Sequence, residues 1–165
     1  MRFRRRPAPP PADLPYLRPR LDGTGWPEES AVGRPSFDTA TFAELGQRHA
    51  YDPEAHVVAD RLTTNLLPHL STGVSAEDEP YLRKTFTTAA RIGAGLGIVE
   101  RGLASSTSAT TMDRRVAGAL WQARRRLPAM RPDWTAAAAW FLLAGYAVAR
   151  SGLHVVDELR EDLGG

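Results

Sequence analysis

Apolar residues recur every three or four positions along most of the chain after residue 36, which is the period of an amphipathic helix. The longest such segment predicts a helix over 78–104, where Ser75 and Asp78 form a capping-box pair before the first turn. A second clear helix is predicted over 52–70. Since only a short turn separates the two, we expect them to pack as antiparallel neighbours.

The segment 134–150 differs from the others because it carries no charge up to Ala149 and is apolar all round. It is shorter than the ~20 residues that cross a bilayer, so it predicts a buried central helix rather than a membrane span. Shorter amphipathic helices are predicted over 38–50, 112–127 and 153–163. The pattern therefore predicts an all-α protein, a five- or six-helix bundle.

The first 35 residues break this pattern, because eight of them are proline and regular helix is excluded there. We expect two parts: 1–35 as an irregular, basic, proline-rich N-terminal arm, and 36–165 as the helical bundle domain. Apolar residues such as Tyr16 and Trp26 could hold the arm against the bundle or against a partner.

A Gly-Ala-Gly-Leu-Gly run at 93–97 lies inside the longest predicted helix, although each glycine there weakens a helix by up to about 1 kcal/mol relative to alanine. Winding the helix places Ala90, Gly93 and Gly97 on one narrow seam. The seam predicts close packing of another helix, with a partner helix or a ligand as the alternative. The run does not match GxGxxG, and no buried strand precedes it, so a dinucleotide site is not indicated.

Charge is small in total but unevenly placed. The chain has a formal net charge of +2. Residues 1–20 and residues 112–131, the two arginine-rich blocks, each contain six arginines and one aspartate. The rest of the chain must then carry about −8, which predicts basic patches on an acidic body.

In the second block, the helical wheel of 112–127 places Trp121 away from the apolar face, between Arg114 and Arg125. A tryptophan exposed among arginines is typical of a protein-anchoring site or of a stacking platform for single-stranded nucleic acid. The alternatives are that the arm covers Trp121 or that this face is merely solvated. The candidate interaction residues are Arg4, Arg5, Arg6, Tyr16, Trp26, Arg114, Trp121 and Arg125.

Candidate chemistry is sparse. Glu100 projects into the apolar arc of its helix, unless it lies near a fraying helix end and reaches an arginine, which is the more frequent case. Asn65 and His69 fall on the apolar face of the 52–70 helix. These three are the weak candidates for catalytic residues. The chain has no cysteine and no Walker, HExxH or GxSxG motif, and its histidines lack a third ligand at a diagnostic spacing. We therefore expect no metal and no cofactor, and an enzyme is not favoured.

The leading hypothesis is a non-enzymatic, cytoplasmic accessory or assembly subunit. It would dock on a larger protein complex, or on copies of itself, through the arm and the basic Trp/Arg helix face. One alternative is a nucleic-acid-binding protein that uses the two arginine-rich blocks. Another is a small helical enzyme or ligand-binding bundle with a buried Glu/His site.

Overall fold

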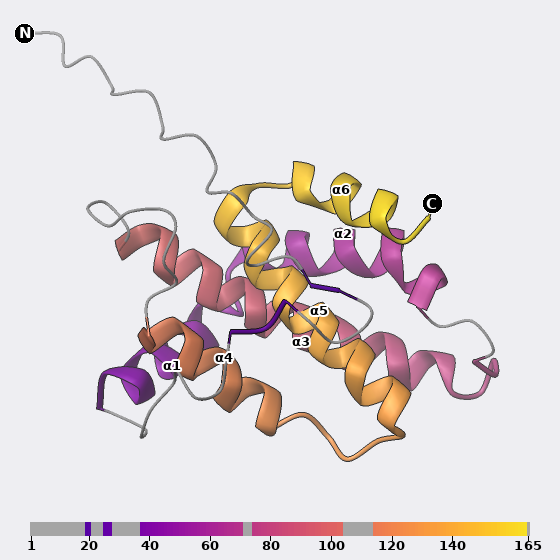
Figure 1. Ribbon diagram of the computed structural model, residues 1–165, viewed down its shortest axis with the longest axis horizontal. Coiled ribbons are helices and arrows are strands. Elements are labelled where there is room, and N and C mark those ends of the chain that lie inside the picture. The colour runs from indigo at the N-terminus through magenta and orange to yellow at the C-terminus, as the bar shows by residue number, and fades with distance from the viewer. Residues whose placement is uncertain (1–18, 21–24, 28–36, 71–73, 104–113, 165) are drawn as a thin grey trace, which may run out of the picture.

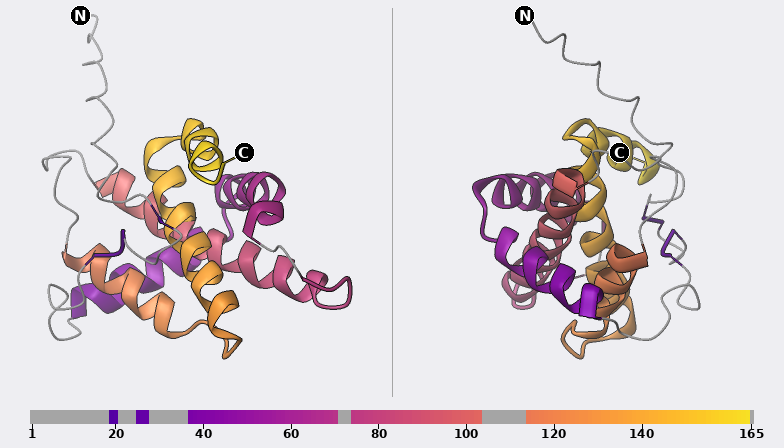
Figure 2. Two further views of the ribbon diagram at one scale, coloured as in Figure 1. Left: turned by 45° about the vertical axis from the view of Figure 1, so that its right-hand side comes forward. Right: turned by 90° about the vertical axis from the view of Figure 1, so that its left-hand side faces the viewer.

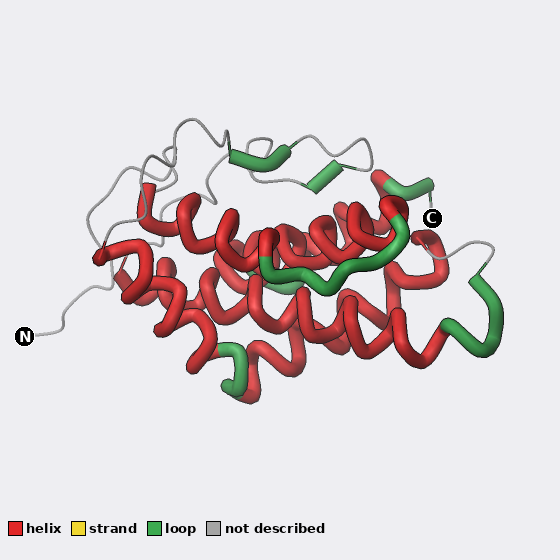
Figure 3. The backbone as a smooth tube through the Cα atoms, turned by 90° about the horizontal axis from the view of Figure 1, so that it is seen from below, coloured by secondary structure: helices red, strands yellow, loops and turns green. Residues whose placement is uncertain are grey.

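The fold was analysed in a computed structural model, which describes residues 19–20, 25–27, 37–70, 74–103 and 114–164, with the side chains of 37–39, 103 and 114 excepted. Within these ranges every regular element is a helix (Figure 3), and the six helices confirm the prediction of an all-α bundle of five or six helices. The helices are α1 (Phe37–His49), α2 (Pro53–Leu70), α3 (Glu79–Leu103), α4 (Arg114–Arg125), α5 (Pro132–Ser151) and α6 (His154–Asp162).

The bundle is organised around α3 and α5, which cross in the middle of the molecule and run in the same general direction (Figure 1). Helices α1 and α4 pack together on one side of this pair, and α2 and α6 pack on the other (Figure 2). The segment from Ala138 to Ala149 is buried throughout, so the charge-free stretch is a central core helix, as predicted. Among the described residues, no helix is both long and apolar enough to span a membrane.

Helix ends follow local signals in the sequence. Helix α2 begins at Pro53, whose missing N–H is no loss in a first turn. Before α3, the Ser75 hydroxyl accepts a hydrogen bond from the Asp78 N–H at 3.2 Å, as a capping residue does. Helix α5 ends at Gly152, which has a φ of 120° that favours glycine, and its N–H donates to the Val148 carbonyl.

The small-residue seam is the contact between α3 and α5. A Cβ placed on Gly93 would overlap the Leu142 carbonyl oxygen, and one on Gly97 would lie 2.6 Å from the Tyr146 carbonyl oxygen. Helix α5 contributes a glycine of its own, because a Cβ on Gly145 would overlap the Ala90 carbonyl oxygen. The two backbones therefore touch directly, and the seam serves packing within the chain.

The middle glycine of the run faces a different helix. A Cβ on Gly95 would overlap the Gly46 carbonyl oxygen and would lie 2.7 Å from the Ala50 nitrogen, both at the end of α1. Glycines two residues apart on a helix point to different sides. The Gly-Ala-Gly-Leu-Gly run thus lets α3 approach α5 on one side and α1 on the other.

Candidate interaction surface

Trp121 is half-buried, not the exposed residue that the helical wheel predicted. Its indole N–H donates a hydrogen bond of 2.8 Å to the Pro27 carbonyl oxygen. The Trp26 ring lies against it, with ring centroids 5.5 Å apart and planes tilted by 51°. The alternative interpretation, that the N-terminal region covers Trp121, is therefore the one that the structure supports at 25–27.

Arg124 completes this contact. Its guanidinium lies 4.6 Å from the centre of the Trp26 ring and 4.9 Å from that of Trp121. Positions 121 and 124 are neighbours on a helix surface, so α4 presents a ring and a cation side by side. Cation–π contacts of this kind contribute about 0.5–2 kcal/mol each. We call Trp26, Trp121 and Arg124 the tryptophan cluster.

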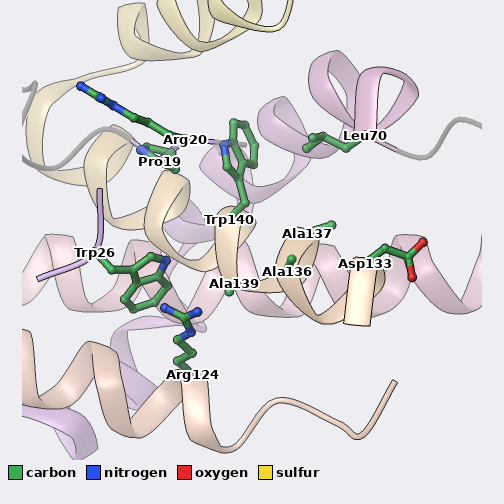
Figure 4. Close-up of a pocket in the computed structure, with 10 residues that line it drawn as sticks. All are labelled: Pro19, Arg20, Trp26, Leu70, Arg124, Asp133, Ala136, Ala137, Ala139 and Trp140. Atoms are coloured by element: carbon green, nitrogen blue, oxygen red, sulfur yellow. The ribbon is translucent and has the colours of Figure 1, made fainter. Parts of the chain in front are cut away.

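The tryptophan cluster borders a cavity that is lined by one described arginine from each arginine-rich block. Arg20, from the first block, and Arg124, from the second, line the same cavity beside α5 (Figure 4). Arg125 and Arg126 follow at the exposed end of α4. Of the other predicted interaction residues, Arg4, Arg5, Arg6 and Tyr16 lie outside the described residues, and of Arg114 only the backbone is described.

Glu100 is buried, as its position on the apolar arc predicted. The Tyr146 hydroxyl donates a hydrogen bond to its carboxylate, and Arg150 Nε lies 3.0 Å from the same oxygen. A buried carboxylate requires a compensating charge and hydrogen bonds, and α5 supplies both. The group ties α3 to α5 near the end of the seam.

The predicted Glu/His site is not assembled, which corrects that hypothesis. His69 is exposed, and Asn65 is half-buried, its amide donating to the Arg61 carbonyl within its own helix. Helices α2 and α3 are antiparallel, so the start of α2 lies beside the Glu100 end of α3 and His69 lies at the far end. Helical periodicity predicts the face on which a residue lies, but not which residues of a neighbouring helix lie beside it.

An ion pair that the sequence analysis missed joins these two helices. Glu54 and Arg101 form two hydrogen bonds of 2.6 and 2.8 Å, and Arg101 also donates to the Ala149 carbonyl at 3.0 Å. The hydrogen bond from Arg101 holds the pKa of Glu54 below its usual value. Forty-seven positions separate the partners, so no local pattern could have indicated the pair.

Within the described ranges, no three histidine, aspartate or glutamate side chains gather as a metal site would require. Comparison of the chain with known protein families, with curated proteins and with solved structures found no match. Function must therefore be inferred from the geometry and charge of the described residues.

Proposed function

We propose that this chain is a non-enzymatic accessory or assembly subunit of the cytoplasm, which docks on an acidic surface of a larger protein complex. The docking surface consists of the tryptophan cluster, the exposed arginines at the end of α4 and the basic region that precedes Trp26. The observation that carries the proposal is the cluster itself, because it joins α4, in the second arginine-rich block, to Trp26 and Pro27, which follow the first block in the chain.

Charge complementarity defines the partner. The end of α4 presents Arg125 and Arg126 to solvent, next to a third guanidinium stacked on two indole rings. Arginine and tryptophan are the residues most enriched at the centres of protein interfaces, where both lose water on binding. An acidic protein segment would complement the positive charge of this surface while packing against the ring edges.

Nucleic acid is a weaker candidate for this surface. Single-stranded binding needs ring faces that are open to successive bases. Here the two rings contact each other, the Trp121 N–H is bonded to Pro27, and Arg124 covers both rings. The geometry therefore favours a preformed protein-docking surface over ring faces on which bases could stack.

The test is native purification of the tagged full chain from its own organism, followed by mass spectrometry of the proteins that co-elute. Arg125→Glu with Arg126→Glu reverses the charge at the end of α4 and should abolish a stoichiometric protein partner. The matched control is Arg61→Glu with Lys84→Glu, which changes the net charge equally at exposed positions on α2 and α3 and should retain the partner.

Three results would count against the proposal. Equal loss of the partner in both double variants would mean that only net charge matters. Retention in both would remove the α4 surface from the interaction. Binding of the purified chain to oligo-dT, with an affinity that falls steeply with salt and with no protein partner, would favour nucleic acid instead. Light scattering of the isolated chain tests whether the partner is a second copy.

A further inference from the structure

A cavity of about 240 Å³ lies between the N-terminal segment, the end of α4 and the first half of α5 (Figure 4). Its two aromatic walls are Trp26 and Trp140. The small side chains of Ala136, Ala137 and Ala139 leave the room between them. The tryptophan cluster borders this cavity, but none of the contacts described above fills it.

Trp140 supplies the second observation. Only 4% of its surface is exposed, yet its indole Nε1–H is buried without a hydrogen-bond partner. The ring is held in place by an edge contact with Phe141, whose centroid lies 5.3 Å away. A phenylalanine would place an aromatic ring there without burying an unpaired donor, and such donors are rare in folded proteins. In Figure 4 the nitrogen edge of the ring faces Pro19 and Arg20 at the cavity wall.

The charges around the cavity indicate which acceptor would suit this donor. Two arginines line the cavity, Arg20 beside the indole nitrogen of Trp140 and Arg124 under Trp26 (Figure 4). Asp133 also borders it, but its carboxylate is bound by Arg131 at 2.9 and 3.2 Å, so its charge is already compensated. An anionic acceptor is therefore favoured over a cationic or neutral one.

We propose that this cavity binds a monocyclic aromatic carboxylate. Its ring lies between Trp26 and Trp140 over the alanines, and its carboxylate accepts the Trp140 indole N–H on the side of Arg20. Size agrees with this class, since a dry cavity of about 150 Å³ already holds benzene, whereas larger cofactors require about 300 Å³ or more. Entry of the ligand requires Pro19 and Arg20 to move aside, because they close over the donor.

The test uses benzoate as the probe and the isolated full chain, so it is independent of any docking partner. In a ¹H–¹⁵N spectrum, the Trp140 indole resonance should shift progressively and saturate as benzoate is added. Trp140→Phe removes the donor and keeps the apolar ring, and should weaken benzoate binding at least about tenfold in calorimetry, as expected for losing a hydrogen bond to a charged group. Benzyl alcohol, which lacks the carboxylate, should bind more weakly than benzoate.

The matched control is Trp134→Phe. This residue is on the same helix and stacks on Arg131 at 4.7 Å, but does not line the cavity, so its replacement should leave benzoate affinity unchanged. An unmoved Trp140 resonance would overturn the proposal, as would equal weakening by both variants or equal affinity for benzyl alcohol. If Trp140→Phe does not fold, the wild-type resonance can be assigned through its proximity to Phe141 and the titration still decides.

Discussion

Replacing Gly93 by alanine tests the direct backbone contact between α3 and α5. The new Cβ would overlap the Leu142 carbonyl oxygen, and would lie 2.8 Å from the Leu142 carbonyl carbon and 3.0 Å from the Tyr146 nitrogen. All three are backbone atoms, which no change of rotamer can move away. The two helices must therefore separate along the seam.

Two opposing terms determine the size of the effect. Alanine in a helix interior is more favourable than glycine by about 1 kcal/mol. Overpacking in a core costs about 1–3 kcal/mol or more, and rigid backbone on the opposing side puts Gly93→Ala at or above the upper end of that range. We expect a net loss of about 2 kcal/mol, which corresponds to a melting temperature about 4–8 °C lower for a chain of this size.

Gly102→Ala is the matched control, because it makes the same substitution in the same helix. A Cβ there would meet nothing within 4 Å, so only the propensity term remains. The variant should be more stable than the wild type by about 0.5–1 kcal/mol. Urea denaturation followed by circular dichroism at 222 nm measures both variants, provided that the transitions remain two-state.

Opposite signs for the two variants are the essential result. If Gly93→Ala were as stable as Gly102→Ala, the α3–α5 seam would not be a direct backbone contact. A loss in Gly93→Ala accompanied by a changed denaturant slope would indicate a looser native state rather than a simple clash.

Three further predictions concern ion pairs and the N-terminal segment. The pKa of Glu54 is lowered in the folded state, so Glu54→Gln should lower the free energy of unfolding at neutral pH. The difference from wild type should vanish as pH falls through that lowered pKa, which denaturation across the acid range would measure. Arg150→Leu should destabilise by about 3–5 kcal/mol, since it removes the positive charge beside a buried carboxylate. Adding Glu100→Leu should restore much of the loss, and additive losses would contradict the pairing. Trp26→Ala should release the N-terminal segment and speed tryptic cleavage after Arg20, and unchanged proteolysis would show that the cluster does not hold it.

The sequence predicted the helices well because hydrophobic periodicity and the residues that start and end helices agree along most of this chain. Pro53, Gly152 and the Ser75/Asp78 pair each act within one helical turn. A helix begins or ends at or next to each of them. The position of Glu100 on the apolar arc also agrees with its burial, because α5 covers that face of α3.

What the sequence could not predict depends on contacts between distant segments. The wheel gave the azimuth of Trp121 correctly as off the main apolar face, but exposure depends on what covers that face, and Trp26 comes from ninety-five positions away. The predicted seam of Ala90, Gly93 and Gly97 gave Gly95 no packing partner, because the position of α1, which Gly95 faces, could not be predicted. The unpaired indole N–H of Trp140 could not be predicted for the same reason, because it depends on which residues from other parts of the chain surround the ring.

The position of Trp26 changes what a deletion of the N-terminal region would test. Removing residues 1–20 takes away the first arginine-rich block but leaves Trp26 and Pro27 to cover Trp121. Removing residues 1–27 also strips the indole of its hydrogen-bond acceptor and of its ring partner, so an apolar surface on α4 becomes exposed. If docking depends on charge, the shorter deletion is sufficient to abolish it. If docking depends on the assembled tryptophan cluster, only the deletion of residues 1–27 abolishes it. The protein that lacks only residues 1–20 then still binds its partner.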